Sequence, residues 1–186
     1  MGEPWLCERP AEVVNGAGIV LQRWSDSDVD ELVDAVNDTL TALRPWMPWA
    51  QQPATPEAMA EVLREGKAAW ETRREFQYVI RGTGGKSSPV GCCGLHNRIG
   101  MGALEIGYWV RTGHGGRGIA TEAARLLTRS ALALGGVQRV EIHCDETNTR
   151  SAAIPAKLGY VLDRVEHRPP ETPEQSNRQM VWVNRG

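Results

Sequence analysis

The sequence has no apolar run long enough to cross a membrane, and its charges nearly cancel. A bilayer-spanning helix needs about 20 consecutive apolar residues, so we expect no membrane-embedded segment. The formal net charge is -2, which removes the electrostatic case for a nucleic-acid-binding protein. We therefore expect neither a membrane nor a nucleic acid as a partner.

Cysteines are few, and their spacing matches no metal site. The four are Cys7, Cys92, Cys93 and Cys144, and they do not form the closely spaced pairs of a zinc site. Cys92 and Cys93 are adjacent in a predicted strand, so their side chains are expected on opposite faces. We expect reduced thiols, no metal and a cytoplasmic location.

The first residues resemble no targeting signal. Met1–Leu6 lacks the basic segment that opens a secretory signal peptide. Leu6 stands where an N-myristoylation site has serine or threonine. Neither secretion nor N-terminal lipidation is therefore expected.

The composition is that of one globular domain. The chain has 186 residues, of which 41% are hydrophobic and 24% charged, enough to bury a core of ordinary size. No internal repeat or low-complexity linker divides it. Residues 1–17 show little periodicity and are interpreted as an N-terminal lead or an extra first strand, and residues 18–186 as one domain.

Hydrophobic periodicity divides this domain into strands and helices. Val29–Leu43 carries an apolar stripe at helical spacing; the capping residues Ser25–Asp28 precede it, and Pro45 ends it. Thr55 and Pro56 are typical of a second helix start. The remaining expected elements are strands at about 18–24, 76–81, 89–98, 103–111, 139–145, 160–167 and 179–183, and helices at about 119–135 and 148–158.

A glycine-rich turn between a strand and a helix is the most informative stretch. His114–Thr121, with the sequence HGGRGIAT, follows the strand at 103–111 and opens the next helix. Glycine lets backbone approach a ligand closely, and a helix start adds unpaired N–H groups and partial positive charge. The turn predicts a phosphate or pyrophosphate site. The alternative is an ordinary loop that holds several glycines.

A second glycine turn is a weaker candidate. Gly85-Lys86-Ser87 looks like the end of a nucleotide-binding P-loop. That motif needs a glycine where Ile80 stands and a helix where a strand is predicted. We interpret this stretch as a solvated hairpin turn.

Two further stretches could belong to a site. The loop Arg44–Trp49 is rich in proline and tryptophan, and it is either a plug in the core or a wall of a substrate pocket. Asn148, in an Asn-x-x-Ser pattern with Ser151, could simply cap its helix, and Gly159 could simply end it. Pro155 is expected near the first turn of that helix, where proline is tolerated.

Taken together, these motifs resemble the GNAT superfamily of acyl-CoA-dependent N-acetyltransferases, in particular the branch of Rim-type ribosomal-protein N-terminal acetyltransferases. The stretches that carry the resemblance are Leu43–Trp49, Glu105–Val110, Gly118-Ile119-Ala120, Asn148-x-x-Ser151 and Leu158-Gly159-Tyr160. The resemblance implies an α+β, three-layer fold: a mixed, mostly antiparallel twisted sheet of about seven strands, splayed in the middle, with helices on both faces. The sequence departs from the family at Gly115, where the pyrophosphate signature has glutamine or arginine.

The resemblance also implies acetyl-CoA as cosubstrate, with no metal. The acceptor would be an amine, either a small molecule or a protein N-terminus, and a homodimer is possible. The implied cofactor-binding residues are Trp109, Val110, His114, Gly115, Gly116, Arg117, Gly118, Ile119, Ala120, Thr121, Asn148, Ser151 and Lys157. The implied acceptor-binding residues are Trp46, Met47, Trp49, His96 and Tyr108.

Glu105 and Ser151 are the candidate catalytic residues. Acetyl transfer needs a deprotonated amine and a protonated leaving thiolate. We assign Glu105 as base, directly or through water, and the Rim-type resemblance implies Ser151 as the acid toward the CoA sulfur. The structural alternative for Glu105 is a solvated or salt-bridged strand acid, and that for Ser151 is a helix first-turn hydroxyl. His96 and His143 are either relays to the base or strand-surface residues. Two other functions stay open: a non-catalytic acyl-CoA-binding module, and an acyltransferase that uses a longer donor such as succinyl-CoA.

Overall fold

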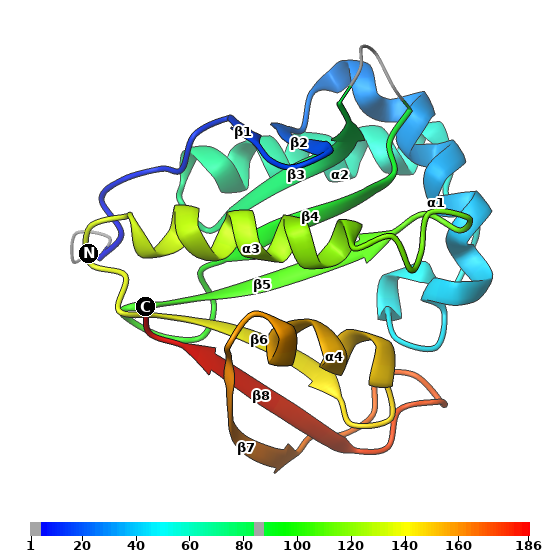
Figure 1. Cartoon of the computed structure of the whole chain (residues 1–186). Helices are drawn as coiled ribbons and strands as arrows, with labels where there is room; N and C mark the ends of the chain where they lie inside the picture. Colours follow the sequence, from blue (N-terminus) through cyan, green and yellow to red (C-terminus); the bar gives the residue numbers. More distant parts are fainter. Residues whose placement is uncertain (1–4, 84–87) are drawn as a thin grey trace.

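The strands of the described chain form a single sheet, and helices connect several of them (Figure 1). The computed structural model describes residues 5–83 and 88–186, so the hairpin turn expected at Gly85-Lys86-Ser87 lies outside the described residues. In chain order the elements are β1 (Val13–Asn15), β2 (Ile19–Arg23), the 3-10 turn η1 (Asp26–Asp28), α1 (Val29–Leu43), the 3-10 turn η2 (Pro48–Ala50), α2 (Pro56–Glu71), β3 (Glu75–Gly82), β4 (Gly91–His96), β5 (Ala103–Val110), α3 (Ile119–Leu132), β6 (Arg139–Asp145), α4 (Thr149–Lys157), β7 (Val161–His167) and β8 (Arg178–Asn184).

The two N-terminal helices begin where their capping residues predict. Ser25 and Asp28 form a capping box, in which the Asp28 carboxylate accepts from the Ser25 amide at 2.8 Å. α1 runs on from there and ends before Pro45. The Thr55 hydroxyl accepts from the Ala58 amide at 3.3 Å and starts α2, with Pro56 in the first helical position.

The strands of the described chain form one mixed sheet in the order β1-β2-β3-β4-β5-β6-β8-β7. β5 and β6 run parallel, whereas the other neighbouring pairs are antiparallel. The parallel pairing joins only Ala103–Glu105 to Arg139–Glu141, and beyond it the two strands part (Figure 1). This confirms the predicted splayed sheet, with eight strands in the described residues rather than about seven because β1 adds an edge within the N-terminal lead.

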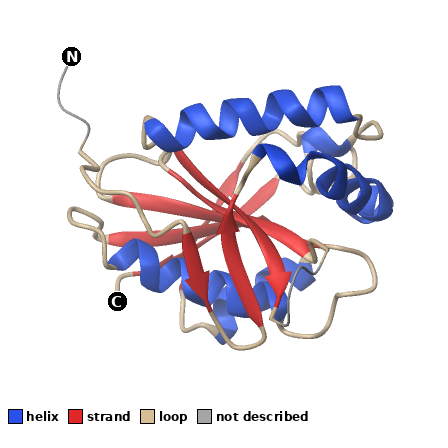
Figure 2. Cartoon of the chain, turned by 90° about the horizontal axis from the view of Figure 1, so that it is seen from above, coloured by secondary structure: helices blue, strands red, loops and turns tan. Residues whose placement is uncertain are grey.

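Helices cover both faces of the sheet (Figure 2). Leu104 and Ile106 of β5 are buried against Ala123 and Leu127 of α3. On the other face, α1 and α2 pack on Val79 and on neighbouring side chains of β4. Side chains alternate along a strand, so Glu105, Gly107 and Trp109 face away from α3.

The last strand is not at the edge of the sheet. β8 is hydrogen-bonded to β6 on one side and to β7 on the other. Pairing of two chains through the backbone of β8 is therefore not open, and the homodimer stays a prediction. In the part of the chain that the structure describes, no helix is both long and apolar enough to cross a membrane.

Candidate active site

The parting of β5 and β6 leaves one edge of β5 without a strand partner. Pairing with β6 stops at Glu105, while pairing with β4 continues to Val110. Within the described residues, the edge from Ile106 to Val110 that faces β6 therefore has unpaired strand backbone. Such an edge can pair with another extended chain.

The glycine turn follows directly at the end of this edge. Gly113, Gly116 and Gly118 have φ values of +86°, +75° and +77°, which only glycine adopts without strain. Gly118 is also the N-cap of α3 and has no side chain to satisfy the first helix amides. A Cβ built on Gly115, Gly116 or Gly118 would have no described atom beyond its chain neighbours within 4 Å. The turn thus presents open backbone N–H groups at a positive helix end, which is an anion site.

The turn is fixed to α1 and to the N-terminal lead. The Thr112 amide donates to the Thr39 hydroxyl at 3.1 Å, and Arg111 donates to Asp38 at 2.9 Å. Glu122, in the first turn of α3, accepts from the Ala17 amide at 2.9 Å and pairs with Arg125. The carboxylate of Glu122 is therefore occupied by Ala17 and Arg125.

On the other side of the gap, α4 presents Ser151. The Asn148 side chain caps the helix by accepting from the Ser151 amide at 3.2 Å. The Tyr108 hydroxyl lies 3.1 Å from the Ser151 hydroxyl and donates to the Ser151 carbonyl at 3.2 Å. Lys157 is exposed at the end of this helix.

Pro155 explains why the Ser151 carbonyl is available. We expected Pro155 near the first turn of its helix, but this was wrong: it is the seventh of the nine residues of α4. A proline lacks the N–H that would bond to the carbonyl four residues earlier, and for Pro155 that carbonyl belongs to Ser151. The Tyr108 hydroxyl takes the place of this lost donor, so Tyr108 and Pro155 together fix where Ser151 sits.

Glu105 lies on the opposite face from α3 and is held by an arginine. Arg98 donates from Nε and Nη2 to the two Glu105 carboxylate oxygens, each at 2.8 Å. The Glu105 side chain is only 11% exposed. Burial raises the pKa of Glu105, but the Arg98 hydrogen bonds and the positive charges around it outweigh burial, so its pKa lies below its usual value.

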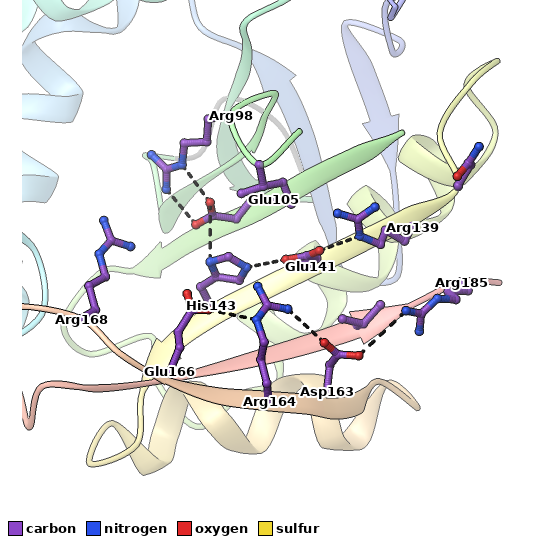
Figure 3. Close-up of a pocket in the computed structure, with 13 residues that line it drawn as sticks. Arg98, Glu105, Arg139, Glu141, His143, Asp163, Arg164, Glu166, Arg168 and Arg185 are labelled. Atoms are coloured by element: carbon purple, nitrogen blue, oxygen red, sulfur yellow. Dashed lines mark hydrogen bonds and ion pairs between the residues drawn. The ribbon is translucent and has the colours of Figure 1, made fainter. Parts of the chain in front are cut away.

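A run of contacts leads from Glu105 to two residues of β6 (Figure 3). His143 Nδ1 lies 3.9 Å from Glu105 Oε2, and His143 Nε2 lies 2.7 Å from Glu141 Oε2. Glu141 also accepts from Arg139 Nε at 2.7 Å. The sequence alternation marks β6 as a strand with one buried face, yet Glu141 on its polar face is only 2% exposed. The available signal was that Glu141 and His143 share one face of a strand next to Glu105.

A cavity of about 730 Å³ opens beside these residues, and its lining is mostly charged. It is lined by Arg98, Ile99, Glu105, Gln138, Arg139, Glu141, His143, Asp163, Arg164, Glu166, Arg168, Val183 and Arg185 (Figure 3). Its far wall is β7 and β8, elements in which the sequence singled out no site residue. Among the described residues, no group of three histidine, cysteine or acidic side chains is arranged to hold a metal ion.

The expected acceptor-binding residues lie outside the lining of this cavity. Trp49 is 55% exposed and tilts toward Trp109, with ring centroids 6.4 Å apart. The loop of Trp46, Met47 and Trp49 is bridged to the loop before β8, because Thr172 donates to the Pro45 carbonyl and Gln175 to that of Trp46. His96 stands opposite Glu105 in β4, with its Nδ1 3.5 Å from Glu75. Tyr108 lies on the α4 side, against Ser151.

A splayed sheet with a glycine turn at a helix start beside the gap defines an acetyltransferase of the GNAT type. The family model described as "Acetyltransferase (GNAT) domain" matches residues 19–161, and the chain belongs to this family. The family and the fold expected from the motifs are thereby confirmed.

Individual relatives agree with this assignment. YdaF of Bacillus subtilis, provisionally named a ribosomal N-acetyltransferase, is 26% identical over 77% of this chain and 78% of its own length. The solved structure of RimL, a ribosomal L7/L12 α-N-protein acetyltransferase in complex with coenzyme A, has a TM-score of 0.84 at 18% identity, over 93% of this chain and 97% of its own. MccE, a microcin C7 self-immunity acetyltransferase solved with acetyl-CoA and AMP, has a TM-score of 0.82 at 19% identity, over 90% and 92%.

The paired carboxylates of this sheet predict a loss of stability in acid. The contact with His96 lowers the pKa of Glu75 to about 2 despite its partial burial, and the pKa values of Glu105 and Glu141 are also lowered. A lowered folded-state pKa stabilises the fold above the unfolded value, and this stabilisation is lost as pH falls through the folded value. We expect the free energy of unfolding to drop by about 1–3 kcal/mol between about pH 4.5 and pH 2, after allowing for solvent screening.

Urea unfolding across this pH range measures the effect. Glu75→Gln should reduce the slope of the free energy of unfolding against pH in acid, whereas Glu174→Gln, at an exposed site, should leave this slope unchanged. A free energy of unfolding that stays constant down to about pH 2.5 would contradict this ion-pair account.

Proposed function

We propose that this protein transfers the acetyl group of acetyl-CoA to a primary amine, on a protein N-terminus or a small molecule. The observation that carries the proposal is the unpaired edge of β5 running into the glycine turn at the start of α3. A free strand edge suits an extended ligand with amide groups, and a bare helix start suits a diphosphate. Coenzyme A joins both chemistries in one molecule, and RimL and MccE were solved with CoA and acetyl-CoA.

We assign the pantetheine arm to the backbone at Trp109 and Val110, and the pyrophosphate to the turn that follows. The turn is formed by His114, Gly115, Gly116, Arg117, Gly118, Ile119, Ala120 and Thr121, and the His114 amide already donates to the Arg111 carbonyl at 3.0 Å. Hydrogen bonds to a charged acceptor contribute about 1.5–3 kcal/mol each, so several amides suffice without a lysine cluster. Glycine at position 115 removes the side chain of the family signature but keeps its amide. Asn148, Ser151 and Lys157 form the opposite wall.

We place the acceptor amine on the Glu105 face, where the charged cavity opens. His96 lies beside Glu105 on the same face because the two residues are register partners in neighbouring strands. The loop of Trp46, Met47 and Trp49 would flank an acceptor that reaches past Trp109. Tyr108 contributes from the other side, through Ser151.

The reaction is direct attack of the neutral amine on the thioester carbonyl. A C–N bond forms, the C–S bond breaks, the amine nitrogen gives up a proton and the thiolate gains one. We assign polarisation of the thioester carbonyl to the Val110 amide. We assign protonation of the thiolate to the Ser151 hydroxyl, which Tyr108 holds in position from 3.1 Å away, and solvent then returns a proton to the serine.

We also propose that the protein works in the cytoplasm. Cys92, Cys93 and Cys144 are buried thiols, and burial raises the pKa of Cys144 to about 11. Thiols kept neutral in this way suit a reducing compartment.

The function is tested by acetyl-CoA binding followed by an acceptor screen. A nearly saturating dose of acetyl-CoA, about 100 times its Kd, should stabilise the fold by about 2.7 kcal/mol and raise Tm by about 5–10 °C. CoA thiol release is then measured with peptides whose N-terminus is free or blocked, and with small amines. We expect release with free amines and none with blocked peptides.

The other outcomes separate the alternatives. Binding without thiol release from any acceptor supports the non-catalytic module. Release from succinyl-CoA in preference to acetyl-CoA supports a longer donor. No thermal shift with either donor would refute the site itself.

A further inference from the structure

A buried histidine lies between two carboxylates at the wall of the cavity (Figure 3). The His143 side chain is only 8% exposed, with Nε2 2.7 Å from Glu141 and Nδ1 3.9 Å from Glu105. An imidazole in this setting has one nitrogen fixed and the other turned toward an acid in a ligand-sized space. This is the arrangement of an oriented base.

Glu141 fixes the orientation of the imidazole ring. Burial raises the pKa of Glu141, but its hydrogen bonds with His143 and Arg139 outweigh burial, so its pKa lies below the usual value and it stays ionised. An ionised carboxylate can only accept, so we assign the hydrogen of the neutral ring to Nε2. The lone pair of Nδ1 then points toward Glu105.

Glu105 itself is a poor proton acceptor. Both of its oxygens receive hydrogen bonds from the Arg98 guanidinium at 2.8 Å. A bidentate pair of this kind stabilises the charged carboxylate. Glu105 is therefore suited to hold a cation and poorly suited to take a proton from one.

We propose that His143, oriented by Glu141, takes the proton from the acceptor ammonium while Glu105 binds the same ammonium as an anion. A nitrogen within hydrogen-bond range, about 2.8 Å, of both His143 Nδ1 and Glu105 Oε2 fits the 3.9 Å between these atoms. This inference rests on the proposed acetyl transfer and names its base.

The proton balance is complete. An N–H bond of the ammonium breaks, its proton joins His143 Nδ1, and the neutral amine keeps the lone pair that attacks the carbonyl carbon. Once the C–N bond has formed, the nitrogen loses a second proton to solvent, which balances the proton that the leaving thiolate gains. The imidazolium returns the proton to solvent through the open cavity. An α-amino group ordinarily has a pKa of about 7.7–8.0, against about 10.4 for lysine, so an α-amine gives up its proton more readily near pH 7.

Charges from every neighbouring element act on this histidine. β8 faces it with the apolar Val181, its register partner. On β7, Arg164 pairs with Glu166 at 2.9 Å and with Asp163 at 3.0 Å, and Asp163 also lies 3.9 Å from Arg185, so these four charges largely offset one another. The charged or titratable groups around His143 are Glu141 and Arg139 on β6, Glu105 on β5, His96 on β4, Arg98 after β4, Asp163, Arg164 and Glu166 on β7, Arg168 after β7, and Arg185 after β8.

The test is the pH dependence of His143→Gln, with the best acceptor found among the peptides and amines. We expect kcat/KM for the acceptor to fall about 100-fold near pH 7, the usual contribution of a general base. The difference in kcat/KM between wild type and variant should shrink to under about tenfold near pH 9.5, because the amine is then deprotonated by solvent. The thermal shift with acetyl-CoA should not change, and added imidazole should restore part of the rate to His143→Ala.

The matched control is His167→Gln, which changes an exposed histidine at the end of β7 outside the cavity lining. Its pH profile should equal that of the wild type. Glu141→Gln keeps the imidazole but removes the carboxylate that orients it. We expect kcat/KM for the acceptor to be about tenfold below that of the wild type near pH 7, with a smaller difference near pH 9.5. If the His143 variants fail to fold, the pH profile of Glu141→Gln tests the proposal instead: a profile equal to that of the wild type would refute the role of His143.

The two levels of the proposal fail differently. A wild-type protein that acetylates none of the acceptors refutes the proposed function. An active wild type with a His143→Gln variant that matches it at every pH, or that is equally impaired at every pH without imidazole rescue, refutes the role of His143 alone.

Discussion

Replacing Ala120 by aspartate is expected to weaken acetyl-CoA binding by about 100-fold or more, while the unliganded protein becomes slightly more stable. Both the loss of affinity and the gain in stability follow from the positive charge at the start of α3. The start of α3 carries partial positive charge that is available to any nearby anion. A carboxylate placed there stabilises the helix and repels a diphosphate.

The position is suited to this test. Ala120 is the second residue of α3, directly after Gly118 and Ile119, and it is partly exposed. An acid in the first turn contributes about 0.3–1 kcal/mol to stability through the helix dipole. The loss of affinity corresponds to about 2.7 kcal/mol, the sum of charge repulsion and of amides now occupied by the new side chain.

Calorimetric titration with acetyl-CoA and urea unfolding without it measure the two effects. Ala120→Asn is the matched control, since asparagine has nearly the size of aspartate but no charge. It should keep most of the affinity. If Ala120→Asp binds acetyl-CoA as tightly as Ala120→Asn does, the pyrophosphate does not sit at this turn.

Sequence patterns predicted most helices and strands, because capping residues, prolines, glycines and hydrophobic periodicity act within a few residues of one another along the chain. The apolar stripe and the two flanking signals, a capping box and Pro45, predicted the bounds of α1. The strict alternation in β6 predicted that strand over 139–145, and the glycine turn predicted the start of α3. Family resemblance then supplied the splayed sheet, which no single stretch of sequence contains.

The polar side of the site could not be predicted in this way, because it depends on contacts between strands. Nothing in the order of residues 98–105 indicates that Arg98 folds back onto Glu105. The burial of Glu141 follows from its register with Glu105 on one side and Val183 on the other. Pro155 was misplaced because proline is tolerated in a first turn and costs a hydrogen bond inside a helix, and the Tyr108 hydroxyl that compensates for that loss lies 43 residues away from Ser151.

The second large effect is expected for Glu105→Gln, which should lower kcat/KM for the acceptor by about 100-fold at every pH. The substitution keeps the size of the side chain but removes the negative charge. The amine nitrogen becomes positive as it bonds to the carbonyl carbon, whether it arrived as ammonium or as neutral amine. A nearby carboxylate therefore stabilises the transition state throughout the pH range, and 100-fold corresponds to about 2.7 kcal/mol.

Steady-state rates against pH, with acetyl-CoA affinity measured in parallel, check this result. Glu61→Gln is the matched control, because Glu61 also pairs with an arginine, Arg64, but on the exposed surface of α2. The control should match the wild type, and acetyl-CoA affinity should be unchanged in both variants.

Comparison with His143→Gln separates the charge that holds the nitrogen from the base that takes its proton. The His143 deficit should narrow in alkali, where the amine needs no base, whereas the Glu105 deficit should persist, because charge still develops on the nitrogen during attack. If instead the Glu105 deficit narrows in alkali and that of His143 does not, the carboxylate is the base despite its pairing with Arg98, and the histidine serves only to position it. Equal rates for wild type and Glu105→Gln at every pH would remove Glu105 from the mechanism.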